Sequence, residues 1–167
     1  MRIALLSEKY PPDLGGLAVS VQRLAQLLLA AGHQVHVFAP HDTPESPQVS
    51  TDGVPVQRLG VLRRTDDTVV EWFNTIFAHH RRRPFDVLHA YYVTQLAFVG
   101  VYAARTVGLP AIVSARGNDL AGQPPLALRL RRLHVRLVGH ALLVGARDAV
   151  AARDVLRGHA HGDVGVG

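Results

Sequence analysis

The sequence predicts a three-layer α/β domain in which helices cover both faces of a mostly parallel β-sheet. Short apolar runs alternate with longer amphipathic segments along nearly the whole chain. The runs, such as residues 3–6, are continuously apolar, which is typical of strands buried on both faces. The segments between most of them are long enough for helices that cross over between parallel strands.

Local patterns justify the individual elements. Residues 17–31 form an amphipathic helix, because Val21, Leu24 and Leu28 recur at three- and four-residue spacing and Gly32 stands at a helix C-terminal cap. Residues 41–53 are polar and rich in turn formers, which predicts a surface loop. Further helices are predicted at residues 68–81, 94–106, 126–138 and 148–156. Strands are predicted at residues 3–6, 35–39, 54–59, 86–90, 110–114 and 141–144.

Length and composition narrow the class of protein. The chain has 167 residues, of which 48% are hydrophobic, and this suits one globular domain with a substantial core. It contains no cysteine, which excludes disulfides, thiolate metal sites and cysteine nucleophiles. The first apolar run is too short for a signal peptide, and charged residues interrupt every longer one. We therefore expect a soluble, cytoplasmic protein.

The charge is strongly basic. The formal net charge is +5 and the pI is about 10.4, almost entirely from arginine, since Lys9 is the only lysine. This balance fits anionic partners such as sugar nucleotides, phospholipid headgroups or nucleic acid. An arginine-rich proteome would explain it equally well. No nucleic-acid partner is expected, because the arginines are scattered and no known reader motif is present.

Ligands of open parallel sheets bind at the carboxyl ends of the strands, which selects five candidate loops. These are residues 7–16, 40 onward, 89–92, 114–123 and 145–148. The first carries Gly15 and Gly16 before a helix, where free N–H groups and the helix dipole favour an anion such as a diphosphate. A tight turn without a ligand is the alternative. The spacing matches neither a dinucleotide-binding fingerprint nor a Walker loop.

Three segments together resemble the glycosyltransferase family 4 enzymes of the GT-B superfamily. The chain opens as "MRIALLSEKYPPDLGGLAVSVQRLAQLLLAAGHQVHVFAP", and "FDVLHAYY" and "GLPAIVSARGNDL" follow in the family's order and spacing. The resemblance implies that residues 1–158 form the Rossmann-like N-terminal, acceptor-side domain and residues 159–167 a linker or tail. It also implies that the donor-binding C-terminal domain, with its paired glutamates, is absent, so that the chain alone is inactive.

The resemblance also implies roles for particular residues. Gly15 and Gly16 match the loop that lies against the donor diphosphate. Asp119 matches the aspartate of the family's H-G-x-D loop, and Asn118 lies beside it. Arg116 stands where the family usually has histidine, and a permanently charged guanidinium suits a phosphate or carboxylate. A local salt bridge between Arg116 and Asp119 is the structural alternative.

Other candidate contacts to the acceptor or sugar come from the residues themselves. His89 lies near the end of the predicted fourth strand, and Tyr91 and Tyr92 follow with rings that suit sugar C–H faces. Glu8 offers a carboxylate near the glycine loop for an acceptor hydroxyl. Alternatively, His89 is a structural residue, and Tyr91 and Tyr92 cap the end of the sheet. No metal site is expected, because His79 and His80 are adjacent on a helix and face apart.

The expected reaction is the transfer of a sugar from a nucleotide-diphosphate-sugar to an unknown acceptor, with retention of configuration. The sugar nucleotide is a substrate, and no cofactor or metal is expected. The helix at residues 126–138 is basic and amphipathic, so it could lie on the inner membrane face near a lipid-linked acceptor, or could pack on the core with a solvated basic face. A stand-alone nucleotide- or anion-binding regulatory module is the alternative function.

Overall fold

A computed structural model describes residues 1–41, 49–61, 66–115, 135–138 and 141–144. Within these ranges the strands form one eight-stranded sheet in the order β3-β4-β2-β1-β5-β6-β8-β7. Five neighbouring strands, β4-β2-β1-β5-β6, are parallel, and β3, β8 and β7 pair antiparallel at the two edges. The strand bounds are β1 Arg2–Leu6, β2 Gln34–His41, β3 Val49–Thr51, β4 Val54–Gly60, β5 Val87–Tyr91, β6 Ala111–Ser114, β7 Val135–Val138 and β8 Ala141–Val144. The predicted α/β class with a mostly parallel sheet is confirmed.

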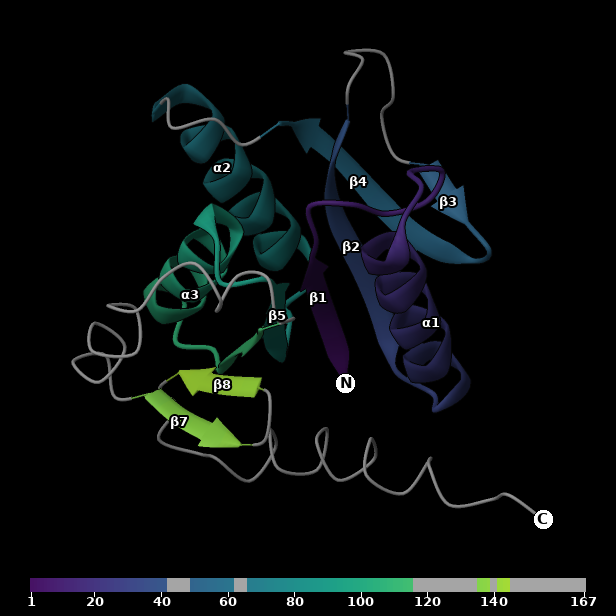
Figure 1. Ribbon diagram of the computed structural model, residues 1–167. Helices are drawn as coiled ribbons and strands as arrows, with labels where there is room; N and C mark the ends of the chain where they lie inside the picture. The colour runs from purple at the N-terminus through teal and green to yellow at the C-terminus, as the bar shows by residue number, and fades with distance from the viewer. Residues whose placement is uncertain (42–48, 62–65, 116–134, 139–140, 145–167) are drawn as a thin grey trace.

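Helices cover both faces of this sheet, as Figure 1 shows. Helix α1 (Gly16–Ala30) packs on one face, and α2 (Asp66–Arg82) and α3 (Gln95–Thr106) pack on the other. The central strand β1 divides its side chains between them. Ile3 and Leu5 join the α1 core, whereas Ala4 and Leu6 join the α2–α3 core. Successive side chains of a strand point to opposite faces, so a continuous apolar run is what two covered faces require.

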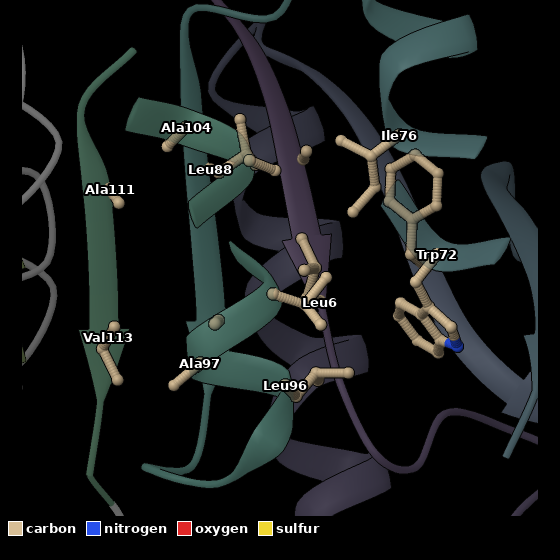
Figure 2. Packing of buried hydrophobic residues seen from close by; sticks show 14 of the residues in the cluster. Leu6, Trp72, Ile76, Leu88, Leu96, Ala97, Ala104, Ala111 and Val113 are labelled. Carbon is tan, nitrogen blue, oxygen red and sulfur yellow. The ribbon is translucent and has the colours of Figure 1, made fainter. Parts of the chain in front are cut away.

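The core on the α2–α3 side contains the largest buried ring, that of Trp72 (Figure 2). Its indole Nε1 donates a hydrogen bond of 2.9 Å to the carbonyl of Gly60 at the end of β4. Leu6, Ile76 and Leu88 pack in the same cluster. This packing anchors α2 and α3 to the sheet.

The structure corrects the sequence prediction at both edges of the sheet. The predicted loop 41–53 contains β3, and β2 continues through Pro40 to His41. Residues 135–138, predicted as the end of a helix, form β7. Short apolar segments such as V-R-L-V fit either period, and pairing with β8 supplies the strand hydrogen bonds. The rest of that predicted helix, the predicted helix 148–156 and the tail lie outside the described residues.

The direction of β8 changes which loops can share a site. Val144, at the carboxyl end of β8, pairs with Ala111 at the start of β6. The end of β8 therefore lies at the amino edge of the parallel strands. Residues 145–148, which the sequence predicted as a loop at the ligand edge, lie outside the described residues. None of the helices in the described ranges is long and apolar enough to span a membrane.

Candidate functional site

A pocket of about 450 Å³ lies at the carboxyl ends of the neighbouring parallel strands β1 and β5. The loop after β1 and the first turn of α1 contribute most of its walls, and the turn after β5 contributes the rest. The lining residues are Glu8, Lys9, Leu14, Gly15, Gly16, Leu17, Tyr92 and Thr94. Four of the candidate residues named from the sequence therefore come together in one pocket, namely Glu8, Gly15, Gly16 and Tyr92.

Gly15 and Gly16 form the wall at which α1 begins. Gly15 has φ +127° and ψ 163°, a backbone conformation that side chains disfavour, and space is open where a Cβ would lie on either glycine. As the N-cap of α1, Gly15 has no side chain that could accept from the first-turn N–H groups. Those groups and the positive end of the helix dipole are therefore available to an anion in the pocket.

A second helix begins at the same pocket. Thr94 is the N-cap of α3, and its Oγ1 accepts a hydrogen bond of 3.4 Å from the backbone N of Leu96. The preceding turn is held by Tyr92, which has φ +70° and donates its backbone N–H to the carbonyl of Ser114 at 2.9 Å. Neither α1 nor α3 has an acidic residue in its first turn. The two helix starts, with Lys9 between strand and helix, favour a negatively charged ligand, and Glu8 opposes them in part.

A buried arginine binds the loop between β1 and α1, residues 7–15, which carries Gly15. Arg58 of β4 is only 7% exposed, and its guanidinium donates to the carbonyls of Pro40 at 3.0 Å and Tyr10 at 2.9 Å, and also to that of Pro11. It forms an ion pair of 3.5 Å with Asp13. A buried charge is stable only with partners of this kind. Arg58 thus connects two strands to the loop that lines the pocket.

The loop is also anchored by a tyrosine. The ring of Tyr10 is fully buried in the core beneath α1. Burial, followed by the nearby Asp52 carboxylate, raises the pKa of Tyr10 to about 12, so this phenol stays protonated at neutral pH. Two contacts therefore anchor the loop to the domain, the charged one to Arg58 and the apolar packing of the Tyr10 ring.

His89 and Tyr91 lie inside the sheet and not among the lining residues of this pocket. His89 is 8% exposed, and its Nε2 lies 2.7 Å from the Oγ of Ser114 on the neighbouring strand. The ring of Tyr91, itself buried, stacks on that of His89 with centroids 4.8 Å apart. Their predicted contact with the acceptor or sugar stays a prediction. Tyr92, by contrast, reaches the pocket.

The predicted contacts Arg116, Asn118 and Asp119 lie outside the described residues. The structure does place the end of β6, which precedes them, next to the carboxyl end of β5, since Tyr91 pairs with Ser114. The membrane-facing role predicted for residues 126–138 also falls largely outside the described part of the chain.

Sequence reasoning did not identify Lys9, Thr94 or Arg58 as part of the site. Thr94 had a usable signal, because a threonine before an apolar helical segment is a typical N-cap. The sequence also offered a signal for Arg58, since it is the only charged residue in β4. Its partners, however, come from segments far away in the sequence, which no local pattern reveals.

Comparisons with known proteins show which proteins this chain is similar to. The family described as glycosyl transferase 4-like domain matches residues 15–161. A GDP-mannose-dependent alpha-mannosyltransferase of Mycolicibacterium smegmatis is 31% identical over 138 residues, covering 73% of this chain and 34% of that protein. A mannosyltransferase of the same name from Mycobacterium tuberculosis is 29% identical over 118 residues, covering 67% of this chain and 31% of that protein. The chain thus spans about a third of the length of these relatives.

Among solved structures, a sucrose-phosphate synthase from Thermosynechococcus elongatus superposes with a TM-score of 0.57 at 19% identity, covering 80% of this chain and 71% of that one. At this identity the likeness shows the fold alone. The five parallel strands flanked by helices match that fold. The chain therefore belongs to the glycosyl transferase 4-like family, and it is a Rossmann-like N-terminal domain of the GT-B type.

Proposed function

We propose that this chain is the acceptor-side domain of a glycosyltransferase that moves a sugar from a nucleotide-diphosphate-sugar to an acceptor. One observation carries the proposal, namely the pocket at which α1 and α3 both begin and whose wall includes Gly15 and Gly16. Family membership supports sugar transfer as the reaction class. The names of the two relatives make GDP-mannose the first donor to test.

The pocket suits the charge that develops during such a reaction. When the bond from the sugar to the diphosphate breaks, negative charge accumulates on the leaving oxygen. Free N–H groups at the start of α1 and the dipoles of two helices stabilise that charge without a metal ion. Lys9, an exposed residue that also lines the pocket, adds a positive charge. Gly15 and Gly16 leave room for the diphosphate to approach the backbone, because no side chain stands in the way.

The proposal extends to stereochemistry and to the partner domain. GDP-mannose carries its sugar in an α linkage, so an α-mannoside product corresponds to retention of configuration. In the GT-B architecture, a second Rossmann-like domain holds most of the nucleotide. We therefore expect residues 1–167 alone to bind a donor weakly and to transfer no sugar, while selecting the acceptor in the complete enzyme.

The test compares residues 1–167 with the same chain extended by its full downstream reading frame. Each protein receives GDP-mannose, UDP-glucose or UDP-N-acetylglucosamine with a membrane and sugar extract as the acceptor pool, and release of the nucleoside diphosphate is measured. We expect release only from the extended protein, and less of it when Gly15 is replaced by Ala. Submicromolar nucleotide binding by residues 1–167, with no turnover in either form, would favour a nucleotide-binding regulatory module instead.

A further inference from the structure

We infer that Arg58 is a positioning residue, which holds the loop between β1 and α1 in the shape that presents the start of α1 to the pocket. This role depends on the proposed function only for the identity of the anion that the loop faces. Arg58 itself does not line the pocket. It would act through the backbone that it binds.

The contacts of Arg58 join two parts of the chain that are distant in the sequence, strand β2 and the loop after β1. One nitrogen, Nη1, donates to Pro40 at the end of β2 and pairs with Asp13, while Nη2 donates to Tyr10 and Pro11. Pro40 belongs to the sheet, whereas Tyr10, Pro11 and Asp13 belong to the loop. A planar guanidinium can hold several acceptors in fixed directions, which the single ammonium of lysine cannot do.

Asp13 passes the restraint on to the backbone of the loop. Its Oδ2 accepts from the backbone N of Tyr10 at 3.0 Å, and its own N–H donates to the Tyr10 carbonyl at 3.2 Å. This closed turn ends two residues before Gly15. The φ of Gly15, +127°, belongs to a sparsely populated region of backbone conformation, which persists only where surrounding contacts hold it. Arg58 neutralises the Asp13 carboxylate and caps the Tyr10 carbonyl, and so stabilises the turn that leads into α1.

The loop carries its own probe of order, because Lys9 is the only lysine in the chain. The peptide bond from Lys9 to Tyr10 is held on both sides: the Lys9 carbonyl accepts from Ser7 Oγ at 2.7 Å, and the Tyr10 N–H is bound by Asp13. A protease that cleaves only after lysine must open the loop to reach this bond. Its cleavage rate therefore measures loop opening at one defined place.

The experiment measures that rate on residues 1–167 at a temperature where each variant remains folded by circular dichroism. We expect Arg58→Met to be cleaved at least about tenfold faster than the wild type, since a tenfold rate change corresponds to the loss of one or two good polar contacts. Arg58→Lys should lie between the two. Gln57→Met is the matched control, because Gln57 lies on the same strand but bonds His79 on the other face, at 3.3 Å.

A second readout separates positioning from mere stability. Inorganic pyrophosphate is titrated into glycine-labelled protein, and the amide resonances of Gly15 and Gly16 are followed. Arg58→Met should weaken pyrophosphate binding about tenfold, whereas Gln57→Met should leave it unchanged. Faster cleavage with unchanged pyrophosphate affinity would reduce Arg58 to a structural role and overturn the inference, as would a wild-type cleavage rate in Arg58→Met.

Two further outcomes also bear on the role of Arg58 and on the diphosphate contact. If Arg58→Met does not fold, Asp13→Asn and Arg58→Lys decide, and wild-type cleavage in both contradicts the inference. If pyrophosphate does not shift the glycine amides of the wild type, the diphosphate contact in the proposed function is wrong. The protease rates still decide whether Arg58 orders the loop.

Discussion

The imidazole rings of His36 and His79 lie against each other between β2 and α2, with centroids 4.4 Å apart. His79 Nε2 lies 3.3 Å from Gln57 Oε1, whereas His36 Nε2 is buried without a partner among the described residues. Burial, followed by the nearby His79 and Arg2, lowers the pKa of His36 to about 3. The pKa of His79 is also lowered, first by burial and then by Arg2 and Arg82.

These shifts predict a loss of stability in mild acid. His36 takes up a proton near pH 6.5 in the unfolded chain but only near pH 3 in the folded one. The folded state is therefore favoured fully above pH 6.5 and loses stability as the pH falls toward 3, by about 3 kcal/mol at pH 4. His36→Phe should flatten this dependence in urea unfolding measured from pH 7 to pH 4. Gln34→Ala, at an exposed position on the same strand, is the control. If the unfolding free energy of His36→Phe depends on pH as steeply as that of the wild type, the lowered pKa of His36 is contradicted.

The two glycines at the start of α1 should respond differently to alanine. Gly15→Ala forces a Cβ onto a backbone with φ +127° and should cost about 1–3 kcal/mol of unfolding free energy. Gly16 lies within the helix with open space at its Cβ position, so Gly16→Ala should be neutral or gain up to about 1 kcal/mol. Chemical denaturation of the two variants tests this. Equal losses of unfolding free energy would show that backbone conformation does not explain why position 15 is glycine.

The contact between His89 and Ser114 should couple two neighbouring strands energetically. The 2.7 Å hydrogen bond joins β5 to β6 inside the sheet. Ser114→Ala should cost about 1 kcal/mol, and a double-mutant cycle with His89→Gln should show a coupling of about 1 kcal/mol. Strictly additive losses would mean that the hydrogen bond contributes nothing to stability.

Close packing of α3 on the sheet should limit the size of residue 100. A Cβ on Gly100 would lie 3.3 Å from the Cβ of Ala90 and 3.4 Å from Cδ2 of Leu6. Gly100→Ala should change the unfolding free energy by less than about 1 kcal/mol, because the gain in helix propensity offsets the crowding. Gly100→Leu should destabilise by about 2 kcal/mol or more. Thermal unfolding of both proteins provides the measurement, and a tolerated leucine would show that α3 can move away.

Much of the fold was predictable because its signals are local. The apolar run at residues 3–6 indicated a strand covered on both faces, and the spacing of Val21, Leu24 and Leu28 indicated the helix that covers one of them. Gly15 was recognisable as a turn before that helix. Each signal depends on residues within one or two turns or a few strand positions, where backbone sterics and burial act directly.

The sequence by itself therefore determined the class of fold, the central elements and the glycine wall of the pocket. Only the tertiary structure decided which loops share that pocket, brought Tyr92 and Thr94 to the same pocket as Gly15, and buried His89 within the sheet. It also turned residues 135–138 into a strand and joined Arg58 to the loop at Tyr10 and Asp13. These outcomes depend on strand order and on contacts between segments that are distant in the sequence. The free energy of such contacts cannot be inferred from a local sequence pattern.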